Sequence, residues 1–124
     1  MTLLTMPVRL ALGLILFVFG LNGFFHFLPV PPMAPRAEAF IRALIDTGYM
    51  LPFWKGMEVA TGLLILFNRF TALALVLVAP IIFNIAAFHI FLDPVNVWIS
   101  LGMLSLWTWL AIGHLRNYRL LFEV

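Results

Sequence analysis

The sequence contains no cysteine and few charged residues. Without cysteine the chain can form no disulfide, no thiolate metal site, no iron–sulfur ligation and no thiol redox centre of its own. Charged residues make up 10% of the 124 residues, whereas soluble domains carry about 25%. A soluble domain is therefore not expected, because this little charge cannot cover a core with polar surface.

Basic residues are scattered along the chain. The formal net charge is +2, and the seven Lys and Arg form no basic patch. A nucleic-acid partner is therefore not expected. The basic residues fit orientation signals at the ends of membrane helices better.

Hydrophobic residues, by contrast, make up 65% of the chain. They gather in four apolar runs, at about 8–28, 51–67, 71–92 and 95–115. Each run suits a membrane helix, which needs roughly 20 apolar residues. The short links after the second and third runs make consecutive helices antiparallel neighbours. The sequence predicts one all-α domain over residues 1–124, an integral membrane four-helix bundle surrounded by the lipid bilayer.

The one long connection follows the first run. Four prolines oppose a helix at its start, and from about 36 to 47 apolar and charged residues fall on opposite helical faces. We therefore expect a short external amphipathic helix between the first two spans. It acts either as a plain connector or as a lid over a site beneath it.

Arginine placement predicts the orientation. Arg9, Arg69, Arg116 and Arg119 fall on one side of the predicted bundle, against Arg36 and Arg42 on the other. The positive-inside rule then makes both termini cytoplasmic.

Polar residues inside apolar runs are the functional candidates, because such groups are costly in a membrane. At about 1.5 Å of rise per residue they fall at nearly one depth, toward the outside. The sequence predicts a ligand-binding polar pocket in the outer half of the bundle, lined by Asn22, His26, Lys55, Glu58, Asn84 and His89.

Roles within this cluster stay open. Glu58 is the best candidate for a catalytic group, and Lys55 three residues away can neutralise it as an ion pair. Asn84 can bond to that carboxylate or to Asn22, while His89 has Asp93 as a partner at i+4. The alternative is that these groups only lock the helices together.

Metal and haem are weaker readings of the same residues. No ligand-spacing motif supports a metal site, so no metal is predicted. His26 and His89 lie on different helices at similar depth, but His89 is expected to face elsewhere, which disfavours haem ligation.

Three segments carry a resemblance to a known family. They resemble the signature segments of the DoxX family of small bacterial membrane proteins and lie at 19–27, 55–64 and 79–94, the second reading Lys-Gly-Met-Glu-Val-Ala-Thr-Gly-Leu-Leu. The resemblance implies four helices in the bacterial cytoplasmic (inner) membrane. It also implies a subunit linked to a quinone or oxidative-stress redox system, of the kind found in a quinone-linked oxidoreductase. A quinone is then the candidate cofactor, and a homo-oligomer or a redox subunit the candidate partner.

Two other functions remain open. The chain can be a non-catalytic membrane scaffold for a partner subunit. A small-solute transporter is the weaker alternative, because the inner half of the predicted bundle lacks polar lining.

Overall fold

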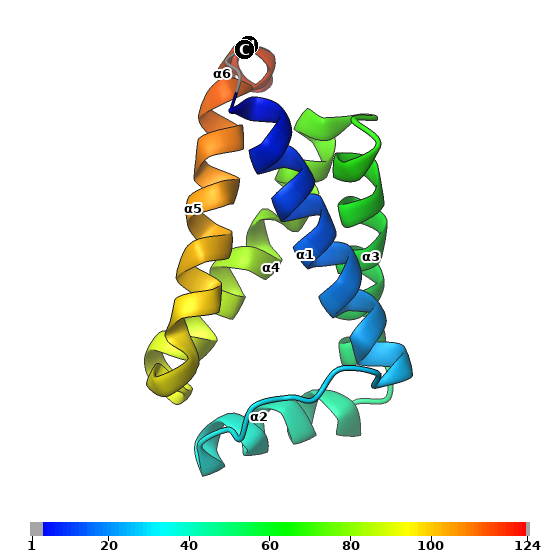
Figure 1. Ribbon diagram of the computed structural model, residues 1–124, viewed down its shortest axis with the longest axis vertical. Helices are drawn as coiled ribbons and strands as arrows, with labels where there is room; N and C mark the ends of the chain where they lie inside the picture. Colours follow the sequence, from blue (N-terminus) through cyan, green and yellow to red (C-terminus); the bar gives the residue numbers. More distant parts are fainter. Residues whose placement is uncertain (1–3, 124) are drawn as a thin grey trace.

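The computed structural model describes residues 4–123, and within that range the chain is helical with no strand. The all-α prediction is confirmed. Four long helices, α1 (Thr5–Phe25), α3 (Met50–Leu66), α4 (Thr71–Leu92) and α5 (Val97–Gly113), pack in a ring in which each contacts the next and α5 returns to α1. The shorter α2 (Pro35–Asp46) lies across one end, while both termini lie at the other (Figure 1).

Three segments are long and apolar enough to cross a membrane: α1, α4, and α5 together with the 3-10 turn before it, Pro94–Gly113. These agree with three of the four predicted runs. The helix in the remaining run, α3, has 17 residues and carries Lys55 and Glu58. Its length of about 25 Å is below the ~30 Å of a typical hydrocarbon core.

Helix boundaries differ from the predicted ones where local chemistry ends or begins a helix. The first helix stops at Phe25, not at 28, because His26 adopts a left-handed conformation (φ 51°). The last one begins at Val97, after a 3-10 turn at Pro94–Asn96, and ends at Gly113 rather than 115. The α4 limits match the prediction, and α2 lies one residue before it, with Pro35 in its first turn.

A glycine seam joins α1 to α3. A Cβ placed on Gly62 of α3 would lie 2.7 Å from the Phe17 amide nitrogen and 3.0 Å from the Gly13 carbonyl oxygen, both on α1. Further along, a Cβ on Gly20 would lie 2.9 Å from the Val59 nitrogen. The two backbones therefore touch directly, which small residues permit between helices in membranes.

A clamp at the end near the termini fixes the same helix pair. The Arg9 guanidinium on α1 donates to the carbonyl oxygens of Ile65 and Leu66, at 2.7 and 2.6 Å. The last carbonyls of a helix have no partner within it, so Arg9 caps α3. A positive charge there also favours the negative end of the helix dipole.

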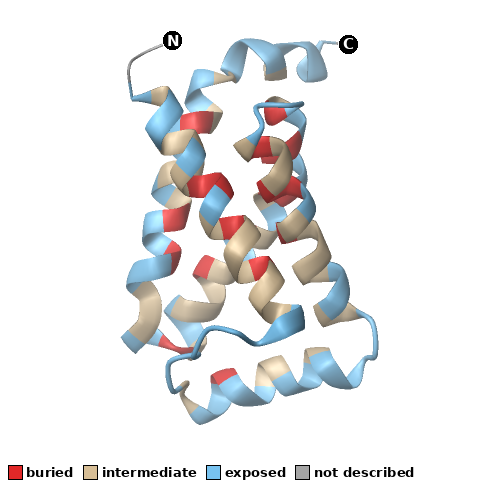
Figure 2. Ribbon diagram, turned by 45° about the vertical axis from the view of Figure 1, so that its right-hand side comes forward, coloured by how far each residue is buried: buried red, intermediate tan, exposed pale blue. Residues whose placement is uncertain are grey.

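The hydrophobic core lies in the half nearer the termini. Its fully buried members come from all four long helices and include Leu12, Leu16, Ile65, Leu75, Val78 and Leu110. Figure 2 shows these buried positions on the facing sides of the long helices, whereas α2 is mostly exposed. Toward α2 the helices spread apart, and α4 diverges from α3 to end beside α5 (Figure 1).

Contacts from the α4–α5 turn hold the proline-rich connection and α2. One oxygen of Asp93 accepts from the Ala34 amide (3.2 Å) and the other from the Asn96 side chain (2.8 Å), which also donates to the Pro32 carbonyl (3.2 Å). The Asn96 hydrogen bond, and then the Ala34 amide, hold the pKa of Asp93 below its usual value against the opposing effect of burial. Aromatic contact between Phe40 and Phe88, with centroids 5.6 Å apart, packs α2 on α4.

Candidate functional site

An ion pair on α3 is the centre of the predicted site. The Lys55 ammonium lies 3.2 Å from a Glu58 carboxylate oxygen, as the i,i+3 spacing predicts. The Glu58 side chain is 2% exposed and that of Lys55 is 25% exposed. Both lie against α1: a Cβ on Gly23 would overlap the Lys55 stem, and one on Gly20 would lie 3.0 Å from the Glu58 Cβ.

This arrangement suits a neutral, tightly packed pair. Burying one charge alone is costly, but a paired and hydrogen-bonded charge is tolerated. Below Glu58, the Thr61 hydroxyl donates to the Met57 carbonyl at 2.7 Å, so it adds no free polar group. The Lys55 side chain, a quarter exposed, is the more accessible member of the pair.

Asn22 and His26 lie at the end of α1, away from the ion pair in their hydrogen bonding. The Asn22 oxygen accepts from the Leu28 amide at 2.7 Å and its nitrogen donates to the Leu28 carbonyl at 3.4 Å. Asn22 thus closes the turn that follows α1. His26 lies past the helix end and is exposed. Asn22 and His26, four residues apart, therefore do not share one helical face, because the chain leaves the helix between them.

His89 bonds within its own helix. Its Nδ1 lies 2.9 Å from the Ile85 carbonyl oxygen. Asp93, its expected partner at i+4, forms its hydrogen bonds with the Ala34 amide and Asn96, while its charge interacts with His89. The histidine therefore keeps a local hydrogen bond, and the carboxylate serves the connection to α2.

Asn84 does not join the others. It is exposed, and it lies on the side of α4 opposite the buried residues Leu75, Val78 and Ile82. It bonds neither to the Glu58 carboxylate nor to Asn22, whose polar atoms have the partners described above. Among the six predicted residues, in the described part of the chain, the hydrogen bonds bring together Lys55 and Glu58 alone. A ligand-binding role for the six stays a prediction.

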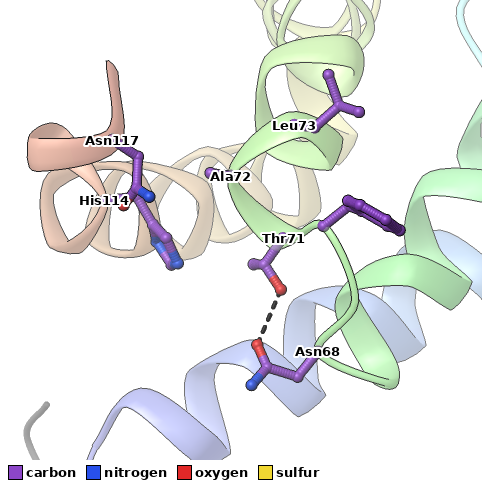
Figure 3. A pocket seen from close by; sticks show the side chains of 7 residues that line it. Asn68, Thr71, Ala72, Leu73, His114 and Asn117 are labelled. Atoms are coloured by element: carbon purple, nitrogen blue, oxygen red, sulfur yellow. Dashed lines mark hydrogen bonds between the residues drawn. The ribbon is translucent and has the colours of Figure 1, made fainter. Parts of the chain in front are cut away.

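A separate pocket lies at the other end of the molecule. It has a volume of about 400 Å³ and is lined by Asn68, Phe70, Thr71, Ala72, Leu73, His114 and Asn117. Figure 3 shows the Thr71–Asn68 hydrogen bond on one wall and His114 and Asn117 on the other. No sequence motif marks this pocket, because its residues come from the α3–α4 turn, the first turn of α4 and the segment after α5.

The described residues contain no group of three or more His, Asp or Glu side chains placed to hold a metal ion. Comparison with known proteins gives no further lead: no protein-family model, no curated protein and no solved structure matches the chain.

Proposed function

We propose that this chain is a non-catalytic membrane subunit, a four-helix bundle with an external α2, that scaffolds a larger assembly. One observation carries the proposal. The polar side chains within the long helices are engaged inside the chain, as the Lys55–Glu58 pair is, and the exception, Asn84, faces outward. Most of these bonds lie within one helix, as in the Lys55–Glu58 pair, and Arg9 and Trp107 bond across to a neighbouring helix. The polar groups therefore support the fold of the chain itself.

The same geometry supports the proposed placement in the membrane. With α3 as a fourth, shorter span, both termini lie on one side and α2 on the other, in keeping with the arrangement in Figure 1. Four of the arginines then lie on the side of the termini, which makes that side cytoplasmic. We place the chain in the bacterial cytoplasmic membrane, as the DoxX resemblance implies.

Topology can be tested directly because the chain has no cysteine. Single cysteines at Thr47 and at Asn117 lie at opposite ends of the molecule. A membrane-impermeant maleimide added to intact spheroplasts should label Thr47→Cys and not Asn117→Cys. Labelling of both from outside, or of Asn117→Cys alone, would refute the orientation.

The role of the ion pair can be tested by removing one charge or both. Lys55→Met alone strands a buried carboxylate, which costs on the order of 3 kcal/mol, whereas Lys55→Met with Glu58→Leu replaces the pair by packed apolar groups and costs little. If the pair serves only to stabilise the fold, the unfolding temperature in detergent should fall in the single variant and return toward the wild-type value in the double variant. A double variant as unstable as the single one would contradict this role.

A second candidate function is a quinone site at the same pair. The partly exposed Lys55 side chain favours it, because an ammonium can donate to a quinone carbonyl oxygen. Quinone would supply the redox chemistry of a quinone-linked subunit. The measurement is the quinone extracted per mole of purified protein. Stoichiometric quinone in the wild type, lost in a stable double variant, would favour this function over the scaffold.

A further inference from the structure

The outward side of α4 carries a stripe of exposed residues. Residues at successive spacings of four, three, four and seven fall on one side of a helix, and here they are Leu73, Leu77, Pro80, Asn84 and Phe91, all exposed. The side opposite them packs in the core. The stripe is apolar except for Asn84, and it carries no charge.

Asn84 lies well inside the helix. Thirteen residues separate it from Thr71 and eight from Leu92, which at 1.5 Å per residue places it about 20 and 12 Å from the two ends. If α4 spans the bilayer, this amide faces hydrocarbon. An amide with no hydrogen bond is costly there, because no water can replace the missing partner.

Other exposed polar groups of the long helices avoid that cost. The Ser105 and Thr108 hydroxyls on α5 are exposed too, but they donate to the carbonyls of Leu101 and Leu104 at 2.8 Å. Among the amide, hydroxyl and ionisable side chains of α1, α3, α4 and α5, as far as residues 4–123 are concerned, Asn84 is the one with no hydrogen bond. Its partner must come from outside the chain.

We propose that this partner is a second copy of the chain, with α4 packed along α4 and Asn84 bonded to its counterpart. This inference rests on the proposed membrane placement. Two copies inserted in the same orientation are related by a two-fold axis along the membrane normal, so identical residues meet at the same depth. An amide both donates and accepts, so Asn84 is its own complement.

The rest of the stripe is compatible with a second copy. Its apolar residues can pack against themselves, and the absence of charge means that two copies meet without like-charge repulsion. Pro80 and the nearby Ala87 are compact, which lets a second helix approach. Nothing on the stripe other than the self-complementary amide selects a partner.

Cysteine cross-linking of the full chain in its native membrane tests the geometry. We expect Leu77→Cys and Phe91→Cys, on the stripe, to form disulfide-linked dimers under mild oxidation. Leu14→Cys on α1 and Ile112→Cys on α5 are similarly exposed controls away from the stripe and should not. The proposal would be overturned by cross-links at the control positions but not on the stripe, or by the absence of any cross-link. It would also be overturned if Leu77→Cys formed a disulfide with a different protein.

The amide is tested in the Leu77→Cys background. Asn84→Leu should weaken self-association about 3- to 10-fold, the range for an interhelical hydrogen bond in membranes. Asn84→Gln should largely restore it, and Asn117→Leu, which removes an exposed amide elsewhere, should have no effect. Equal association in Asn84→Leu and wild type would overturn the role of Asn84.

Insertion is monitored separately by resistance to alkaline extraction. If wild-type protein is extracted, the proposed membrane placement itself has failed. Wild-type protein that stays in the membrane while Asn84→Leu is extracted would mean that this variant fails to insert. The stripe cross-links in wild type and in Asn84→Gln then test the dimer. Cross-links that persist in Asn84→Gln support it, and their absence refutes it.

Discussion

The glycine seam between α1 and α3 gives the sharpest stability prediction. Gly62→Ala places a methyl group 2.7 Å from the Phe17 amide nitrogen and 3.0 Å from the Gly13 carbonyl oxygen. Both are backbone atoms, so no side chain can rotate away. Restoring an ordinary contact of 3.4 Å needs a local shift of about 0.7 Å between the two helices.

That shift disturbs the packing of the whole pair. Overfilling a tight interface costs about 1–3 kcal/mol, and moving α1 from α3 also strains the Arg9 clamp and the contacts around the Lys55–Glu58 pair. We expect Gly62→Ala to lower the free energy of unfolding by about 2 kcal/mol. The assay is thermal or denaturant unfolding of the purified protein in one detergent, followed by circular dichroism.

Gly56→Ala is the matched control on the same helix. Nothing lies within 4 Å of a Cβ at Gly56, so alanine brings only its better helix propensity, about 0.5–1 kcal/mol in favour of folding. The two alanines should therefore change stability in opposite directions. If Gly62→Ala unfolds at or above the wild-type temperature, the close approach of α1 and α3 is refuted.

Three further predictions concern contacts at the helix ends. Arg9→Ala removes the charged donor from the Ile65 and Leu66 carbonyls, of which Ile65 keeps the Asn68 amide, and should destabilise the fold by about 2 kcal/mol, the contribution of a hydrogen bond to a charged group, in the same unfolding assay; full stability would count against the clamp. Trp107→Phe replaces the indole by a smaller phenyl ring and removes the N–H that donates to the Leu75 carbonyl at 2.9 Å, and should cost at least about 1 kcal/mol; no loss would mean that the bond contributes nothing. Contacts in the folded chain lower the pKa of Asp93 from its ordinary value of 3.8. They therefore stabilise the connection at pH values above 3.8 and are lost as the pH falls below that value. Limited proteolysis at 29–35 should therefore accelerate below about pH 4 in wild type and be independent of pH in Asp93→Asn, and equal acid sensitivity in both would refute the assignment.

The sequence predicts element type and length well here. Long apolar runs and turn residues define α4 to the residue, and the i,i+3 spacing of Lys55 and Glu58 predicts their ion pair. These are local properties. Each depends on residues within a few positions of one another, so no knowledge of distant neighbours is needed.

The arrangement of the predicted site is not local. Counting residues gives the depth of Asn84, but its direction depends on which side of α4 meets the other helices. Apolar residues surround that helix, so no amphipathic pattern indicates its buried side. Asp93 shows the same limit: it bonds to Ala34, 59 residues earlier in the chain, and no spacing rule connects them.

The Arg9 clamp also constrains the order of biogenesis. The positive charge that would retain the amino-terminal end in the cytoplasm finds its protein acceptors only at Ile65 and Leu66, more than fifty residues later in synthesis. In the proposed membrane placement, that guanidinium is left to solvent and lipid headgroups until α3 is made. Completing α3 gives it protein acceptors, so in that placement one side chain first sets the orientation and then joins α1 to α3.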